Sequence, residues 1–280
     1  MTTTANSQDV SSIADGQKEA DWGATPRRNS AFRDIYLVGA RAIRLALRDP
    51  EAVIPNLVIG IFFFLVNIGA FQRLMTDQFS VDVKAYQMPV AILFTITGVS
   101  RAARVVVDIE GGYFDRLLMT PIRRVTLLLG LMVADFLIVV GLTVAVLVLG
   151  LAMGVRFESG LSGMLVFILL AASWGIAYSG IPYSIALKTG NPAAVNGGFL
   201  LFFPFAFLTT SLVPTSLMTG WMAVATTYNP VTYLLNGLRS LILDGWDGTA
   251  LLKAFASVVL VGAVTLALAL AALRGRASSR

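Results

Sequence analysis

The chain has 280 residues, of which 56% are hydrophobic and only 13% are charged, and its mean hydropathy is +0.78. Soluble domains carry roughly a quarter charged residues, so this composition indicates an integral membrane protein. The absence of cysteine and histidine excludes disulfides and thiolate metal sites and removes the commonest general base, which argues against an intramembrane enzyme. The formal net charge of +5 comes from basic residues beside apolar segments, so no nucleic-acid partner is expected.

The N-terminal region divides into two parts. Residues 1–30 are rich in Ser, Thr, Asp and Gln and contain no apolar run, which predicts a disordered cytoplasmic tail and not a signal peptide. Residues 31–49 place apolar side chains on one helical face and mainly arginines on the other. This pattern predicts an amphipathic helix lying along the membrane surface, in contact with lipid.

Six apolar segments follow within residues 50–273, each near the roughly 20 residues that a membrane-spanning helix needs. We expect spans at about 52–71, 86–106, 125–154, 161–187, 195–214 and 250–273. Residues 215–248 are apolar too, but Gly220, Pro230, Gly237 and Gly245 interrupt them, which predicts two short re-entrant helices at the external face. The expected fold is an all-α integral membrane protein with an interfacial helix, six spans and a cytoplasmic tail over 274–280.

Basic residues are divided unevenly between the two sides of these spans. Of the 21 Lys and Arg residues, 16 fall in the two termini and in the loops around 101–124 and 188–194. Loops rich in Lys and Arg remain on the cytoplasmic side of a membrane. Both termini are therefore predicted to be cytoplasmic.

Residues 107–124 form a charged interruption between the second and third predicted spans. Together with the residues just before them, they carry charges on one helical face at Arg101, Arg104, Asp108 and Asp115. An apolar stripe lies beside these charges at Ile109, Tyr113 and Leu117. Such a segment cannot lie in hydrocarbon, and two interpretations fit it equally, a docking surface for another protein or a solvated loop on lipid headgroups.

Other candidate chemistry is sparse. No G-x-x-x-x-G-K-[ST] phosphate loop is present, so this chain is not expected to bind ATP by that route. Asp135 is the only carboxylate inside an apolar span, a position that favours interhelical pairing or interfacial exposure over a proton relay.

The first and fifth predicted spans are rich in aromatic residues, a pattern that by itself favours lipid-facing bulk over an adaptable surface for a hydrophobic substrate. Gly60, Gly69, Gly197 and Gly198 are small enough for close helix approach, so we expect these spans to meet at a dimer interface. The candidate residues for this interface and the translocation path are Phe62, Phe63, Asn67, Phe199, Phe203 and Phe207.

Three stretches resemble the permeases of type-2 ATP-binding cassette exporters, in particular the daunorubicin- and doxorubicin-resistance branch. The pattern D-x-E-x-G-x-x-[DE]-x-L-L-x-T-P of their first cytoplasmic loop occurs here as Asp108, Glu110, Gly112, Asp115, Leu117, Leu118, Thr120 and Pro121. Residues 187–196 are similar to their second cytoplasmic turn, and residues 211–245 to their external segment. Two positions depart from the family pattern. Tyr113 stands where Thr is common, and the usual Pro is missing before Gly220.

The resemblance implies a permease without a nucleotide site or bound cofactor, which forms a homodimer or pairs with a paralogous permease. Two copies of a separate ATPase subunit, carrying ATP and Mg²⁺, would dock beneath the first cytoplasmic loop. The candidate coupling residues are Asp108, Glu110, Gly112, Tyr113, Asp115, Arg116, Leu117, Leu118 and Pro121. The external re-entrant motif comprises Gly220, Trp221, Asn229, Pro230 and Tyr233.

The expected function is export of hydrophobic drug-like or lipid-like cargo across a bacterial plasma membrane. A polyprenyl-linked glycan is an alternative cargo. A proton-driven carrier is an alternative of another class, but it needs titrating groups in its path, and the spans offer little beyond Asp135. A structural membrane scaffold is a further alternative, and it would not need the stretch at 107–124.

Overall fold

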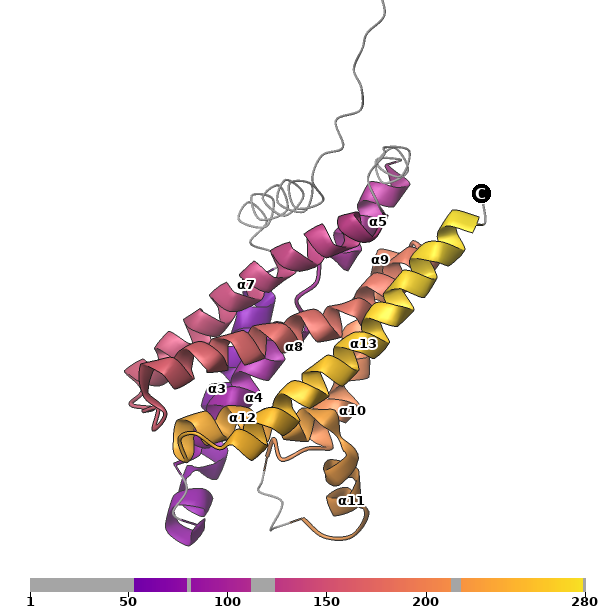
Figure 1. Cartoon of the computed structure of the whole chain (residues 1–280). Helices are drawn as coiled ribbons and strands as arrows, with labels where there is room; N and C mark the ends of the chain where they lie inside the picture. The colour runs from indigo at the N-terminus through magenta and orange to yellow at the C-terminus, as the bar shows by residue number, and fades with distance from the viewer. Residues whose placement is uncertain (1–52, 80–81, 112–123, 213–217, 279–280) are drawn as a thin grey trace, which may run out of the picture.

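The computed structural model describes residues 53–79, 82–111, 124–212 and 218–278, and every regular element in these ranges is a helix (Figure 1). The long helices are α3 (Ile54–Phe79), α4 (Val83–Thr97), α7 (Arg124–Ala152), α8 (Gly160–Thr189) and α13 (Gly248–Ser278). The short helices are α5 (Ala102–Glu110), α9 (Pro192–Gly197), the 3-10 helix η2 (Gly198–Leu201), α10 (Phe202–Phe207), α11 (Gly220–Tyr228) and α12 (Pro230–Leu243). The predicted tail over 1–30 and the interfacial helix over 31–49 lie outside the described residues.

Within the described ranges, five helical segments are long and apolar enough to cross a membrane. They are Ile54–Arg73, Val83–Val107, Leu129–Ala152, Gly160–Thr189 and Gly248–Gly275, and they correspond to the first, second, third, fourth and sixth predicted spans. The chain is therefore a multi-pass membrane protein, and the prediction of an all-helical membrane fold is confirmed. Helix α13 continues to Ser278, so the predicted C-terminal tail is helical over most of its length.

The fifth predicted span, over 195–214, differs from the expectation. It consists of α9, η2 and α10 in succession, an apolar run from Pro192 to Phe207 that is shorter than the five spans. At about 1.5 Å per residue, this run is shorter than a hydrocarbon core of about 30 Å. Pro204 has no N–H to donate, and the paired glycines at 197 and 198 disfavour a helix interior, which explains why the run is segmented.

The second span is in two parts, because residues 98–101 separate α4 from α5. Helix α4 is buried on every side, with 14 of its residues inside the molecule, so it is the central helix of the bundle. Two of its buried threonines are hydrogen-bonded inside the protein: the Thr95 hydroxyl donates to the Ala91 carbonyl at 2.8 Å, and the Thr97 hydroxyl donates to the Leu93 carbonyl at 2.6 Å and accepts from the Trp174 indole at 3.1 Å. This burial explains why apolar residues are found on every face of α4.

Close helix contacts depend on small residues, as expected where hydrocarbon surrounds the bundle. A Cβ added at Gly180 of α8 would lie 2.6 Å from the backbone carbonyl carbon of Thr265 in α13. A Cβ added at Gly60 of α3 would lie 2.7 Å from the carbonyl oxygen of Ala91 in α4. Gly60 therefore allows a close approach between α3 and α4 within this chain, and its predicted part in a dimer interface stays a prediction.

Helices α11 and α12 lie at the end of the bundle opposite to α5 and the C-terminus (Figure 1). The turn between α7 and α8 joins the same end, because the Ser159 hydroxyl donates to the Leu241 carbonyl of α12 at 2.6 Å. The chain thus enters this end from α10 and leaves it through α13. The prediction of two short helices before the last span, within 215–248, is confirmed.

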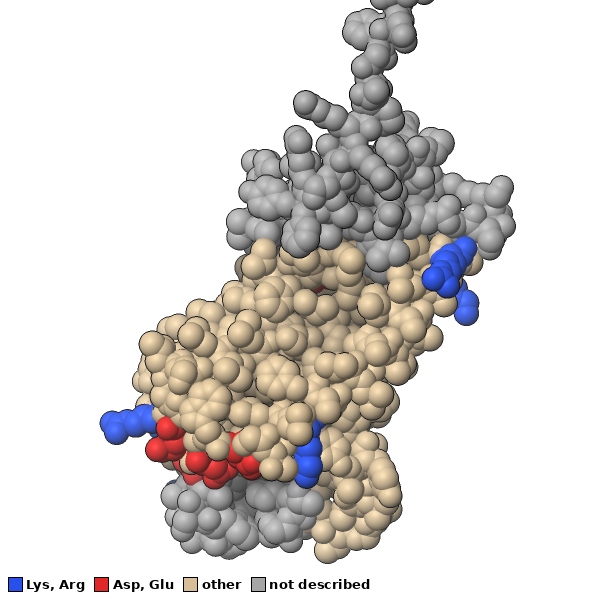
Figure 2. Space-filling model, viewed as in Figure 1, with Lys and Arg blue, Asp and Glu red and all other residues tan. Residues whose placement is uncertain are grey.

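On the face drawn in Figure 2, the charged side chains lie at the two ends of the bundle, and none lies in its middle. Acidic side chains gather near the α12 end, where Asp82, Glu158, Asp244 and Asp247 are all exposed. Basic side chains lie at both ends, including Lys188 at the end of α8 and Lys253 near the start of α13. An apolar belt between two charged ends is the pattern that a bilayer requires.

Candidate coupling and translocation site

Helix α5 is fixed to the bundle by one buried face. Ala102, Val105 and Val106 are buried, and they belong to a second apolar cluster, separate from the main core, at this end of the molecule. The other buried members come from α7, α8, α9 and α13, and they are Met132, Tyr183, Ala186, Leu187, Val195, Ala269 and Leu273. Four other helices therefore hold the position of this short helix.

The opposite face of α5 has no covering element in the described part of the chain. Arg104, Val107 and Glu110 recur at a spacing of three residues and are exposed, and 48% of the Val107 surface is accessible. An exposed valine between two exposed charges is suited to a partner surface with an apolar centre and a polar rim.

The structure places only part of the predicted coupling stretch. Asp108 and Glu110 lie in the last turn of α5. The remaining candidates lie outside the described residues, and they are Gly112, Tyr113, Asp115, Arg116, Leu117, Leu118 and Pro121. Their roles stay predictions.

An ion pair lies at the break between α4 and α5. The Arg101 guanidinium is 3.6 Å from the carboxylate of Asp135 in α7, and Asp135 is only 1% exposed. The hydroxyl of Tyr183 in α8 donates a hydrogen bond to the same carboxylate at 2.6 Å. The base of α5 is thus tied to two spans by charged and polar groups inside the protein.

This arrangement confirms one sequence expectation and corrects another. Asp135 takes part in interhelical pairing and is not exposed at an interface. Arg101, which the periodicity placed with Arg104 on the outer polar face, points instead into the bundle and is 13% exposed. The sequence analysis missed Tyr183, although a tyrosine inside a long apolar helix has a hydroxyl that needs a partner.

Most of the predicted aromatic residues meet around Phe94 of α4, which the sequence analysis did not single out. Phe63 stacks on Phe94 with ring centroids 4.4 Å apart, and Phe203 and Phe207 contact the same ring at 6.1 and 5.9 Å. Phe199 joins the group through Phe203 at 5.2 Å. The first span and the segmented fifth run are therefore connected through the central helix.

Two predicted path residues lie apart from this aromatic cluster. Phe62 is 60% exposed on the outer face of α3, and among the described aromatic rings it contacts that of Phe63, edge to face at 6.1 Å. Asn67 is 6% exposed inside the bundle. Phe62 is thus available to lipid or a second chain, whereas Asn67 is not.

Residues of the predicted external motif cap α12 and hydrogen-bond neighbouring segments. Asn229 caps α12 by accepting from the Val231 N–H at 3.0 Å, and Pro230 occupies the first helical position, where no N–H is needed. The Asn229 amide also donates to the carbonyls of Phe205 and Leu208 at 2.7 and 2.8 Å. The Tyr233 hydroxyl donates to the Thr227 carbonyl of α11 at 2.7 Å.

The motif begins with a glycine and an exposed tryptophan. Gly220 starts α11 with a φ of 62°, a left-handed conformation that glycine adopts without steric cost. Trp221 is 73% exposed, in keeping with the preference of tryptophan for membrane interfaces. In the described ranges, no group of acidic side chains could hold a metal ion.

Comparison with known proteins decides the family. The sequence model of the family described as ABC-2 type transporter matches residues 33–243, which span α3 to α12 and include both the coupling stretch and the external motif. The chain belongs to the ABC-2 type transporter family.

Relatives of this ABC-2 protein include permeases named for drug resistance. The daunorubicin resistance ABC transporter permease protein DrrB1 of Streptomyces coeruleorubidus is 24% identical over 272 residues, covering 93% of this chain and 95% of the relative. The probable doxorubicin resistance ABC transporter permease protein DrrC of Mycobacterium tuberculosis is 28% identical over 207 residues, covering 71% and 72% of the two chains. These matches confirm the resemblance identified from the motifs.

The ion pair at the break yields a stability prediction. Arg101→Met leaves the Asp135 carboxylate buried without its cation, a loss that typically costs about 3–5 kcal/mol. We expect a clear fall in the melting temperature of the detergent-purified chain. The double variant Arg101→Met/Asp135→Asn should recover most of the loss, because no charge remains buried.

The matched control is Arg104→Met, which removes an exposed arginine from the same helix and should melt near the wild-type temperature. If Arg101→Met and Arg104→Met melt alike, the pair does not stabilise the junction.

Proposed function

We propose that this chain is the permease subunit of an ABC exporter that moves hydrophobic cargo out of the cell with ATP hydrolysed on a separate ATPase subunit. The observation that carries the proposal is the placement of α5. One face of this helix is anchored among four other helices, while Arg104, Val107 and Glu110 remain exposed at the end of the bundle. Membership of the ABC-2 family supports the same role.

The coupling mechanism follows from this anchoring. An ATPase that binds the exposed face of α5 and the following stretch would move α5 as a lever, since the helix is rigid and short. The Arg101–Asp135 pair and the Tyr183 hydrogen bond would pass that movement to α7 and α8. ATP and Mg²⁺ belong to the ATPase, because this chain has no phosphate loop.

The cargo is proposed to be apolar, drug-like or lipid-like. The aromatic cluster around Phe94 offers an adaptable apolar surface, and the relatives DrrB1 and DrrC are named for daunorubicin and doxorubicin resistance. A polyprenyl-linked glycan is the alternative cargo. A proton-driven carrier is less well supported, because Asp135 is already held by Arg101 and Tyr183.

The coupling test uses one reversed charge and one buried charge. In cells that co-express this chain with its ABC ATPase subunit, Glu110→Lys reverses a charge on the proposed docking surface, and Leu117→Asp places a carboxylate in the predicted apolar stripe of that surface. Exposed charge pairs contribute under about 1 kcal/mol, whereas an unpaired charge in an apolar contact costs several. ATPase co-purification and cargo-stimulated ATP turnover should therefore fall for both variants, and further for Leu117→Asp.

The control for this test is Glu158→Lys, the same charge reversal at an exposed residue of the opposite end. It should leave ATPase binding unchanged. Normal abundance, ATPase retention and transport by Leu117→Asp would exclude the coupling role of 107–124.

The proposed location is the bacterial plasma membrane with both termini in the cytoplasm, because most Lys and Arg residues fall on that side. The chain contains no cysteine, so single cysteines can report the orientation. Glu158 is exposed, unlike its buried neighbour Ser159, and Glu158→Cys should react with an impermeant thiol reagent in intact cells. Ser278→Cys should react only after the cells are broken, and the reverse pattern would invert the topology.

The active form is proposed to contain two copies of the permease, with α3 and the apolar run Pro192–Phe207 at their interface. The outer face of α3 exposes Val58, Phe62 and Val66 at 57%, 60% and 47%. Phe62→Cys should cross-link two copies in membranes more efficiently than Leu165→Cys, which lies on α8 and is similarly exposed at 58% in the native side chain. Equal yields would argue against this interface.

A further inference from the structure

A buried arginine holds the α12 end of the bundle together. Arg239 of α12 is 5% exposed, and its guanidinium lies 3.5 Å from the centre of the Tyr86 ring of α4. It donates to the Tyr86 carbonyl at 3.1 Å, and to the hydroxyl and carbonyl of Thr210 at 2.7 and 2.8 Å. These contacts use neutral acceptors only.

No carboxylate among the described residues comes within ion-pair distance of Arg239. The ion pair in this part of the chain joins two other residues, Arg101 and Asp135. Burying a cation without an anion is costly, and in membrane proteins such a residue is by default a candidate functional site. The planar guanidinium also has more N–H groups than the three contacts use. Arg239 therefore has the charge and the donor groups to bind a negatively charged group.

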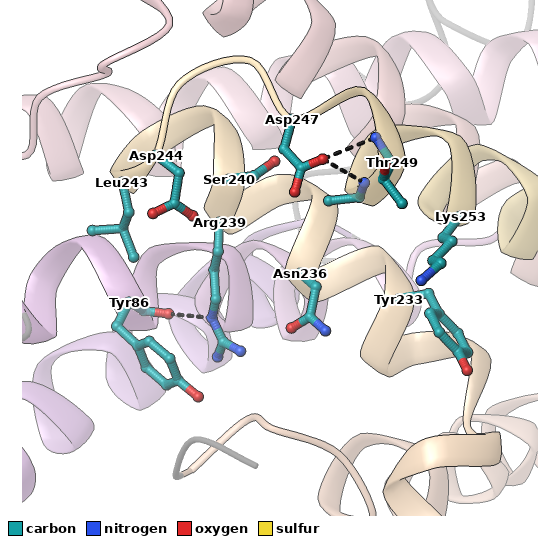
Figure 3. A pocket seen from close by; sticks show the side chains of 11 residues that line it. Tyr86, Tyr233, Asn236, Arg239, Ser240, Leu243, Asp244, Asp247, Thr249 and Lys253 are labelled. Carbon is teal, nitrogen blue, oxygen red and sulfur yellow. Dashed lines mark hydrogen bonds between the residues drawn. The ribbon is translucent and has the colours of Figure 1, made fainter. Parts of the chain in front are cut away.

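Arg239 borders an open hollow of about 420 Å³, within the range of about 300–1,000 Å³ typical of small-molecule pockets. Figure 3 shows Arg239 and Asp244 on one side of this hollow and Lys253 on the other, with Asn236 between them. Asp247 lines the hollow too, but its carboxylate already accepts the backbone N–H groups of Thr249 and Ala250 at 2.8 and 3.1 Å.

The charges that line the hollow are balanced. Arg239 and Lys253 are basic, and Asp244 and Asp247 are acidic. A simple anion would face two carboxylates, and a simple cation would face two basic groups. A ligand that carries both a phosphate and an amine, joined by a short linker, would match both kinds of group.

The hollow lies where two membrane spans begin. Helix α4 begins at Val83 and α13 at Gly248, so this region is at the boundary between the polar and apolar layers of the bilayer. Trp246 is 56% exposed beside it, as expected for an interfacial aromatic residue. Next to Lys253, α13 exposes an apolar strip that could hold acyl chains, at Leu252, Phe255, Val259 and Leu260.

We propose that this hollow binds the phosphoethanolamine headgroup of a membrane phospholipid. Arg239 and Lys253 contact the phosphate, Asp244 accepts from the ammonium group, and the acyl chains lie along α13. The bound lipid fastens the junction between α12 and α13 to the membrane boundary. This site does not depend on the transport function proposed above, since it requires neither ATP nor cargo.

Free phosphoethanolamine has the same headgroup chemistry, so the test includes it. The full-length chain, purified and delipidated in a neutral maltoside detergent, is titrated with dihexanoyl phosphatidylethanolamine, dihexanoyl phosphatidylglycerol and phosphoethanolamine, and bound molecules are counted by native mass spectrometry. We expect one phosphatidylethanolamine per chain, bound more tightly than either other compound. Phosphatidylglycerol has the phosphate but no amine, and phosphoethanolamine has no acyl chains.

The variants separate the two charged contacts without disturbing Arg239, whose loss would also disturb folding. Lys253→Met should weaken the binding of both lipids by about tenfold, the equivalent of one charge-assisted contact. Asp244→Asn should weaken phosphatidylethanolamine alone and so remove the preference over phosphatidylglycerol. Arg156→Met removes an exposed cation of the same end that does not line the hollow and should change neither affinity.

Three outcomes would overturn the proposal. The contact between Asp244 and the ammonium group would be excluded if phosphatidylglycerol bound as tightly as phosphatidylethanolamine and Asp244→Asn had no effect. Free phosphoethanolamine binding as tightly as the lipid would exclude a membrane-derived ligand. Equal losses in Lys253→Met and Arg156→Met would show that only the general charge of this end matters.

Discussion

The contact between Arg101 and Asp135 determines where α5 leaves the bundle. An ion pair buried between helices has to be formed within the protein, because a single charge left in that environment is very unfavourable. The break after α4 must therefore lie where α7 presents Asp135 and α8 presents the Tyr183 hydroxyl. Since the next residues of the chain pack into the second apolar cluster, both the position and the direction of α5 are fixed by these contacts.

At the opposite end, the chain after the short helix α10 has backbone carbonyls that need hydrogen-bond donors, because this helix ends before it can cross the bilayer. Helix α10 ends at Phe207, and the last carbonyls of a helix have no partner within it. Side chains of α12 supply the missing donors, because Asn229 binds the carbonyls of Phe205 and Leu208 and Arg239 binds that of Thr210. Non-helical backbone at membrane depth is tolerated where protein covers it in this way.

Central helix α4 connects the two ends. Its first turn carries Tyr86, which contacts Arg239, its middle carries Phe94 in the aromatic cluster, and the break that follows it carries Arg101. A displacement of α5 would thus reach the aromatic cluster and the re-entrant helices through one buried element. Such a rigid-body transmission is consistent with the coupling proposed for this ABC-2 protein.

The sequence by itself determined the properties that depend on composition and local pattern. The five long spans follow from apolar length, because the bilayer thickness sets how many residues a helix needs. The two short helices before the last span follow from Gly220 and Pro230, which break or start helices wherever they occur. The family followed from the motifs at 108–121, 187–196 and 211–245, which the match over residues 33–243 confirmed.

Tertiary structure alone decided which residues meet. Arg101 fits a helical polar stripe as well as a buried pair, and only the packing of α7 and α8 against the break turns it inward. The residues around Phe94 and Arg239 in sequence do not show what these two side chains contact. Their roles come from residues more than 100 positions away in the chain, as in Phe94 with Phe202 and Phe207 and Arg239 with Tyr86. Periodicity describes one helix at a time, whereas these contacts depend on how several helices pack, so no local pattern could specify them.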